Sequence, residues 1–176
     1  SGSMIPEGRM AMAQANPLQT GVHSLTPNLV VRSAAKAIDF YKAVFGAEEI
    51  TRLEKSDGRI WHAELRIGDS VLFLSDELPH SSVRAPSPEA FASTAIQVYV
   101  DDADSVFRKA LDAGARSLRK VSDTFWGDRM GIVADPFGHT WVISTHVKDV
   151  PAEQVRRDGE ELTRASGLQT AGISGA

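Results

Sequence analysis

Few residues of this 176-residue chain have the types and spacing that chemistry needs. His62 and Glu64 stand two apart in a run of strand-like residues, so both side chains point to one face of that strand. Together they could hold a metal ion, although a polar strand face without a metal is the commoner meaning of this spacing. Asp128 is a further acid–base candidate, and the sequence does not show whether any two of these groups meet. We expect hydrogen-bonding or solvated roles for His139 and His146, and we expect His23 and His80 to lie in flexible segments.

Missing residue types and motifs narrow the chemistry further. The chain has no cysteine, which excludes disulfides, a thiolate zinc site and a cysteine nucleophile. It also lacks the HExxH, P-loop and Gly-x-Ser-x-Gly motifs. A net charge of −4 without a basic cluster argues against nucleic acid as a partner. No apolar run approaches the ~18 residues of a membrane span, and no signal peptide opens the chain, so we expect a cytoplasmic protein with no membrane partner.

A second candidate site is the aromatic segment before Arg129. Phe125 and Trp126 are adjacent and precede a flexible glycine, and two such neighbours rarely both enter a core. Either ring could lie over a planar ligand while Arg129 pairs with an anionic or carbonyl group. The alternative is that Trp126 packs locally and Arg129 pairs with Asp128.

The elements that must position these residues occur twice, offset by about 68–70 residues. Each half reads as strand, amphipathic helix and three strands, with turns at Asp57-Gly58, Gly68-Asp69 and 135–138. The first half predicts strands over 29–31, 49–54, 60–67 and 70–75, and a helix over 34–45 that Ser33 caps and Gly46 ends. The second half predicts strands over 95–100, 116–121, 130–134 and 140–145, and a helix between Asp101 or Asp102 and Gly114.

This repeat divides the chain into paired modules, in an α+β fold of two βαβββ units. The predicted boundaries are 1–23 for a tag scar and mobile arm, 24–78 for the first module, 79–91 for a proline-containing linker, 92–147 for the second module and 148–176 for a short exit helix and flexible tail.

At the level of motifs, the chain resembles the vicinal oxygen chelate superfamily, which includes glyoxalase I, extradiol dioxygenases, fosfomycin-modifying enzymes and bleomycin-resistance proteins. The resemblance lies in Pro27-Asn-Leu-Val-Val, Ala37-Ile-Asp-Phe-Tyr-Lys, Phe45-Gly-Ala, Tyr99-Val-Asp-Asp-Ala and Asp135-Pro-Phe-Gly-His-Thr-Trp. It implies curved mixed sheets whose concave faces form a shared cleft, and a homodimer.

The metal enzymes of that family carry His, Gln or Glu on the first and last strands of each module. The resemblance places these four positions on Thr26, Leu72, Ala95 and Val142, and a shift by one residue offers Pro27, Phe73, Ile96 and Ile143. Neither set can ligate a metal through its side chains, apart from the hydroxyl of Thr26. We therefore expect no metal and no other cofactor.

Strand alternation predicts which residues line the cleft. A tight hairpin at Gly68-Asp69 sets Leu65 opposite Leu72, on a face with Trp61, and we expect this face in the cleft. In the second module, Arg129, Gly131 and Val133 are expected opposite Ser144, Val142 and Thr140, whereas Trp141 is expected in the core. The predicted ligand-binding residues are Asn28, Trp61, Leu65, Leu72, Gln97, Tyr99, Phe125, Trp126, Arg129 and Val142.

Three functions are compatible with these features. The first is a glyoxalase/bleomycin-resistance-like protein that binds a small planar or amphipathic molecule in an apolar cleft without a metal. The metal positions that cannot ligate favour this function. The second is a glyoxalase- or dioxygenase-like lyase or transferase with a non-standard site. The third is a dimeric scaffold whose cleft is vestigial.

Overall fold

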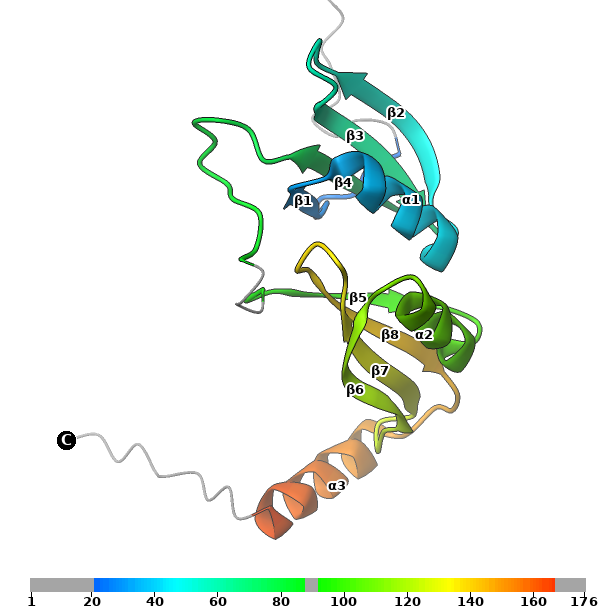
Figure 1. Cartoon of the computed structure of the whole chain (residues 1–176). Coiled ribbons are helices and arrows are strands. Elements are labelled where there is room, and N and C mark those ends of the chain that lie inside the picture. The colour runs from blue at the N-terminus through cyan, green and yellow to red at the C-terminus, as the bar shows by residue number, and fades with distance from the viewer. Residues whose placement is uncertain (1–20, 88–91, 167–176) are drawn as a thin grey trace, which may run out of the picture.

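The computed structural model describes residues 21–87 and 92–166 (Figure 1). The predicted tag scar, the arm up to residue 20 and the tail from residue 167 lie outside the described residues. The elements are β1 (Asn28–Val31), α1 (Ala34–Phe45), β2 (Glu48–Glu54), β3 (Ile60–Ile67), β4 (Ser70–Asp76), β5 (Ala95–Tyr99), α2 (Ala103–Asp112), β6 (Arg116–Asp123), β7 (Asp128–Ala134), β8 (Thr140–His146) and α3 (Ala152–Ala165). The expected α+β order of two βαβββ modules is confirmed.

Each module forms its own four-stranded mixed sheet, with strand order β1-β4-β3-β2 in the first and β5-β8-β7-β6 in the second. The first strand of each module pairs in parallel with the last, and the other pairs are antiparallel. A parallel pair needs a crossover connection, which α1 and the next two strands supply in the first module. As a result β1 and β5 are both edge strands.

α1 and α2 each begin at a carboxylate, but the two carboxylates come from different parts of the module. Asp102 caps α2 through a 3.0 Å hydrogen bond from the Ser105 amide. The expected cap of α1, Ser33, makes no such bond, and the Ala34 amide instead donates to Asp76 on β4, at 2.8 Å. The other oxygen of Asp76 accepts from the Ile60 amide at 2.8 Å, so one buried carboxylate joins α1, β3 and β4. Gly46 ends α1 with φ of 65°, as the sequence predicts.

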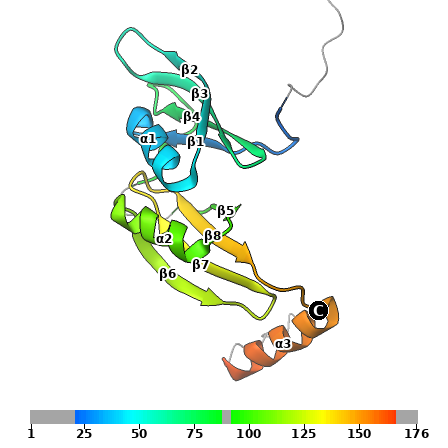
Figure 2. The ribbon, with the colours of Figure 1, turned by 90° about the vertical axis from the view of Figure 1, so that its right-hand side faces the viewer.

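Both helices cover the same side of the molecule. α1 and α2 contact each other, and each packs on its own sheet, so the two sheets lie behind one pair of helices (Figure 2). We call the uncovered side of each sheet its open face. Alternation along β8 places Trp141 and Ile143 against the helices and Val142 and Ser144 on the open face.

A buried carboxylate joins the two modules where α1 meets β8. Asp135 accepts hydrogen bonds from the Tyr41 hydroxyl at 2.7 Å and from the Trp141 indole at 2.9 Å. Its other oxygen accepts from the amides of Phe137 and His139, both at 2.9 Å. Burial, and then the charge of Asp135, raises the pKa of Tyr41 well above its ordinary value, so the phenol donates at neutral pH. Trp141 is 1% exposed, which confirms its expected place in the core.

The expected cleft face of the first module is wrong. Leu65 does pair with Leu72, as the tight hairpin predicts, but both are buried against α1. The two modules differ in the connection that precedes their last strand. Two residues separate β3 from β4, whereas five residues separate β7 from β8, so equivalent positions on β4 and β8 are not the ones that the sequence comparison paired. The residue equivalent to Val142, which pairs with Gln97, is therefore Phe73, which pairs with Asn28. Trp61 has no partner on β2, where a β-bulge turns it outward to 60% exposure.

In the second module, the observed pairing of β7 with β8 differs from the expected register by one residue. Because Ala134 pairs with Thr140, Arg129 lies opposite Thr145, Gly131 opposite Ile143 and Val133 opposite Trp141. These residues of β7 therefore face α2: a Cβ at Gly131 would stand 2.8 Å from the Phe107 ring. The residues that β7 presents on the open face are Asp128, Met130 and Ile132.

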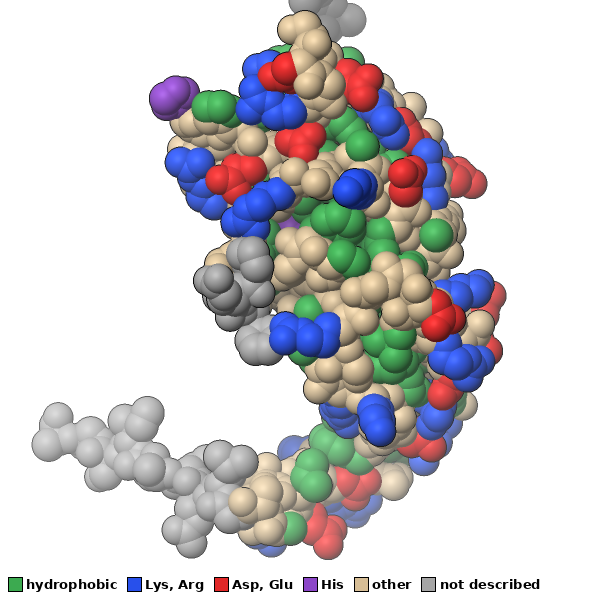
Figure 3. All heavy atoms as spheres, in the orientation of Figure 1, with side chains coloured by type: hydrophobic (Ala, Val, Ile, Leu, Met, Phe, Trp, Pro, Cys, Tyr) green, Lys and Arg blue, Asp and Glu red, His purple; other side chains and the backbone are tan. Residues whose placement is uncertain are grey.

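The C-terminal helix α3 extends away from the second sheet, and Phe125 contacts it at Gly159. None of its residues is buried. Charged side chains gather over the outer rims of the two modules, while apolar side chains reach the surface between them (Figure 3). Within residues 21–87 and 92–166, no helix is both long and apolar enough to cross a membrane.

Candidate functional site

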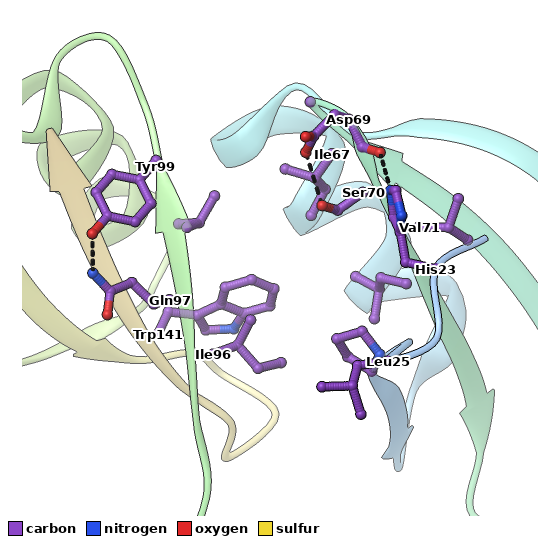
Figure 4. A pocket seen from close by; sticks show the side chains of 14 residues that line it. His23, Leu25, Ile67, Asp69, Ser70, Val71, Ile96, Gln97, Tyr99 and Trp141 are labelled. Atoms are coloured by element: carbon purple, nitrogen blue, oxygen red, sulfur yellow. Dashed lines mark hydrogen bonds between the residues drawn. The ribbon is translucent and has the colours of Figure 1, made fainter. Parts of the chain in front are cut away.

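A groove of about 470 Å³ lies between the modules, bounded by β5 on one side and by the β3–β4 hairpin on the other (Figure 4). Ile96 and Trp141 point into it from the second module, and Leu25 and Ile67 point into it from the first. The remaining apolar lining residues are Pro27, Val71, Leu72 and Val98. Ligand sites have volumes of about 300–1,000 Å³ and mostly apolar walls, so the groove has the size and lining for a small organic molecule.

The rim of the groove carries little charge. Asp69, in the hairpin, is the only carboxylate among the described lining residues, and His23 is the only imidazole. His23 lies 3.4 Å from the Asp69 carbonyl oxygen, and the Ser70 hydroxyl donates to the Asp69 carboxylate at 2.9 Å. No Lys or Arg occurs among those described lining residues. The electrostatic potential of the groove therefore disfavours an anion.

Gln97 and Tyr99 border the groove and also belong to a polar cluster on the open face of the second sheet. Their side chains lie on the far side of β5 from the hairpin (Figure 4). At the centre of the cluster, Asp128 is 4% exposed. One of its oxygens accepts from the Tyr99 hydroxyl at 3.0 Å and the Trp126 indole at 3.3 Å, and the other lies 2.8 Å from His146 Nδ1. We call Gln97, Tyr99, Trp126, Asp128, Ser144 and His146 the Asp128 cluster.

The turn before β7 holds Trp126 at the edge of this cluster. The Thr124 hydroxyl accepts from the Asp128 amide at 3.0 Å and donates to the Asp128 carbonyl at 2.8 Å. Gly127, at the tip, has φ of 100° and accepts from the amides of Val147 and Lys148. Phe125 packs edge-on against Trp126, with ring centroids 4.9 Å apart. The turn is therefore held in place by the Thr124 hydroxyl on one side and by the Val147 and Lys148 amides on the other.

The ionisable groups of the cluster hold each other in charged forms. Burial alone would raise the pKa of Asp128, but hydrogen bonds from His146, Tyr99 and Trp126 bring it below its ordinary value. Hydrogen bonds to Asp128 and to Asp149, which lies 2.9 Å from Nε2, raise the pKa of His146. An imidazolium with both N–H groups on carboxylates is a poor general base, so this pair does not favour proton abstraction.

We predict that this pairing can be followed by pH. Because the pKa of His146 is raised in the folded state, its contribution to stability is complete below its ordinary value of 6.5 and is lost as pH rises through the folded-state value. Because the pKa of Asp128 is lowered, its contribution is present above its ordinary value of 3.8 and is lost at lower pH. Nuclear magnetic resonance titration should give a pKa for His146 above 6.5, and Asp149→Asn should lower it. An unshifted midpoint would contradict the pairing.

A second pair of ionisable groups lies on the open face of the first sheet. His62 Nε2 is 3.2 Å from a carboxylate oxygen of Glu64, and the His62 ring packs edge-on against Phe73 at 5.1 Å. The sequence spacing placed these two side chains on one face, and the structure brings them into contact. Asn28 stands beside Phe73 on the same face.

The metal positions that the resemblance implies do not fit a divalent ion. Phe73 takes the place assigned to Leu72, and Phe73, Ala95 and Val142 carry hydrocarbon side chains. The Thr26 hydroxyl donates to the His23 carbonyl at 3.0 Å. Among the described residues, no group of three or more His, Asp or Glu side chains lies close enough together to hold a metal ion. The carboxylates of Asp128 and Asp149 instead form hydrogen bonds with His146, and Asp128 also accepts from Tyr99 and Trp126.

The predicted site residues do not form one site, and only some of them come together. Gln97, Tyr99 and Trp126 come together in the Asp128 cluster, with Val142 beside Gln97. Asn28 is on the other open face, and Leu65 and Leu72 are in the core, although Leu72 also reaches the groove. Trp61 is exposed at its bulge, and Phe125 packs against α3. Arg129 does not meet Asp128: it pairs with Asp104 on α2 and with Asp123.

Three residues of the site were not assigned to it from the sequence: Leu25, Asp128 and His146. Asp128 stood out only as an isolated carboxylate, and Leu25 precedes the first expected strand. Ser144 was expected in the cleft, and the same alternation along the last strand would also have placed His146 there.

Comparison with known proteins agrees with this architecture. The model of the Glyoxalase/Bleomycin resistance protein/Dioxygenase superfamily matches residues 21–143, which extend from before β1 into β8. The chain belongs to this superfamily. The resemblance drawn from its motifs is thereby confirmed.

Similar proteins come from bacteria and a plant. The uncharacterized protein Rv0887c of Mycobacterium tuberculosis is 37% identical over 153 residues, 85% of this chain and 90% of that protein. TioX from Micromonospora sp. ML1 is 27% identical, with a TM-score of 0.55 over 70% of this chain and 98% of TioX. A gene product of Arabidopsis thaliana is 28% identical, with a TM-score of 0.54 over 69% of this chain and 98% of its own.

Proposed function

We propose that this superfamily member binds a small amphipathic molecule in the groove between its modules. The observation that carries the proposal is the groove itself: about 470 Å³ of space with apolar walls from both modules. The apolar part of the ligand lies between Leu25 and Ile67 on one side and Ile96 on the other. Its polar end extends past the edge of β5 to Gln97 and Tyr99.

The non-ligating positions on the open faces support binding without a metal. Phe73 and Val142 present hydrocarbon where metal-dependent relatives would present oxygen or nitrogen. The fixed imidazolium of His146 supports binding over acid–base catalysis for the same reason: its two N–H groups are already donated to carboxylates.

Leu25→Ala should weaken binding of the neutral fluorescent amphiphile N-phenyl-1-naphthylamine about three- to tenfold. Leu25 is 90% exposed in the free protein, so the ligand covers a side chain whose loss does not disturb the core. Each buried CH₂ contributes about 0.8 kcal/mol, and 1.4 kcal/mol is about tenfold in affinity. Fluorescence titration of the full chain measures the dissociation constant.

The matched control is Leu162→Ala, which removes a leucine of 59% exposure from α3, far from the groove. It should leave the dissociation constant unchanged. Equal weakening by the two substitutions would show that the probe binds apolar surface without selection, and no saturable binding by the parent protein would refute the proposed function.

We also propose that the protein is a homodimer, because each sheet leaves an edge strand uncovered by its own module. Sedimentation equilibrium at micromolar concentration should give about twice the chain mass of 19.0 kDa. A monomer over the whole concentration range would contradict this.

A further inference from the structure

The direction of each hydrogen bond in the Asp128 cluster follows from chemistry. An ionised carboxylate can only accept hydrogen bonds, so the Tyr99 hydroxyl donates its one proton to Asp128, at 3.0 Å. The Tyr99 oxygen must then accept from its next neighbour, Gln97. The Gln97 side chain therefore turns its NH₂ group toward Tyr99, at 3.0 Å, because a carbonyl oxygen in that place would face a lone pair.

With this direction fixed, every side-chain N–H of the cluster already has an acceptor within the protein. The second proton of the Gln97 amide is directed at the Ser144 hydroxyl, 3.2 Å away, and Ser144 is fully buried. The Trp126 indole donates to Asp128, and His146 donates to Asp128 and Asp149. Two acceptors remain for a ligand. One is the carbonyl oxygen of Gln97, which is turned away from Tyr99 (Figure 4), and the other is one lone pair of the Tyr99 oxygen.

The exposed part of the cluster therefore consists of acceptors, aromatic rings and the half-exposed imidazolium of His146, whose two N–H groups are already donated to carboxylates. Tyr99 is 61% exposed and Trp126 is 36% exposed. The carboxylates of Asp128 and Asp149 outnumber the one cation, His146, and the groove rim adds Asp69. The nearest arginine on β7, Arg129, faces α2 and is paired with Asp104 and Asp123. Acceptors, ring faces and net negative charge all favour a cation that carries N–H groups.

We infer that the polar end of the ligand is an ammonium group, which donates to Gln97 and Tyr99 at the edge of β5 while the apolar body lies in the groove. This inference rests on the proposed function, because it assigns the charge of the molecule that the groove binds. A carboxylate or phosphate in the same place would face acceptors only and would leave its oxygens without donors.

Three probes with one apolar body test the assignment: 4-phenylbutylamine, 4-phenylbutan-1-ol and 4-phenylbutanoate. Calorimetric titration of the full chain at pH 7.5 and fixed ionic strength should show that the amine binds at least tenfold more tightly than the carboxylate, with the alcohol between them. Equal binding of amine and carboxylate, or tighter binding of the carboxylate, overturns the inference and leaves the groove function standing. Failure of all three to bind refutes the proposed function as well, and the inference with it.

Asp128→Asn tests whether the carboxylate sets this preference. The substitution removes the negative charge that lies 3.0 Å from the Tyr99 hydroxyl, so the amine-to-carboxylate affinity ratio should fall at least fivefold. The matched control is Asp123→Asn, which removes the same charge from an exposed position beside Arg129 and should leave the ratio unchanged.

Gln97→Met provides a second variant in case Asp128→Asn does not fold. Methionine keeps the length of the side chain but removes its carbonyl acceptor, while Tyr99 can still donate to Asp128. The affinity ratio should fall here as well, with little change in binding of the apolar body as measured with N-phenyl-1-naphthylamine. An unchanged ratio in Gln97→Met would overturn the role assigned to its carbonyl oxygen.

Discussion

Asp135→Ala is expected to lower the free energy of unfolding by more than about 3 kcal/mol, since it leaves several buried donors without an acceptor. The carboxylate accepts four hydrogen bonds, two of them from Tyr41 and Trp141 at the junction of the modules. A buried donor without a partner costs about 1–3 kcal/mol, and the cavity adds to this. Urea unfolding followed by circular dichroism measures the loss.

A double-mutant cycle separates the orphaned donors from other effects of the substitution. Tyr41→Phe alone removes one donor and should cost about 1 kcal/mol. In the Asp135→Ala background it removes a donor that has no acceptor, so it should cost less than it does alone, or stabilise the protein. Strict additivity of the two substitutions would contradict the hydrogen bond between the modules.

The sequence predicted the repeat because each element of one module returns in the other about 68–70 residues later. Turn chemistry also predicted the pairing of Leu65 with Leu72, since a two-residue hairpin leaves one register. The five-residue connection before Thr140 allows more than one register, and there the prediction was one residue off. A shift of one residue exchanges the two faces of a strand, which is why Arg129 and Val133 were assigned to the wrong face.

The long-range partners of the buried carboxylates could not be predicted from spacing. Asp135 looked like a turn residue, and its partner Tyr41 is 94 positions away. Asp128 depends on Tyr99, Trp126 and His146, which lie on separate elements. Their approach follows from strand pairing, which sets Tyr99 opposite Ser144 and Asp128 opposite His146, and from the Gly127 turn. Neither leaves a periodic pattern in the chain.

Gly127→Ala is expected to lower the free energy of unfolding by about 3–5 kcal/mol. At φ of 100°, a side chain costs about 1–2 kcal/mol, and overpacking typically adds about 1–3 kcal/mol. The overlap here is severe, because a Cβ would meet the Lys148 carbonyl and contact Val150 at 3.2 Å. The same contact carries the hydrogen bonds from the Val147 and Lys148 amides, so it holds the Trp126 turn against the segment leading to α3.

Gly58→Ala is the matched control for this substitution. Gly58 also has a positive φ, of 81°, but a Cβ there would meet no atom within 4 Å. It should therefore show only the conformational cost of about 1–2 kcal/mol. The excess loss in Gly127→Ala, measured by urea unfolding of both variants, gives the contribution of the close approach at Lys148. Since the turn positions Trp126 against Asp128, Gly127→Ala should also raise the exposure of Trp126 to acrylamide quenching, whereas Gly58→Ala should not. Equal losses in the two variants would show that the turn can move away from Lys148 without cost.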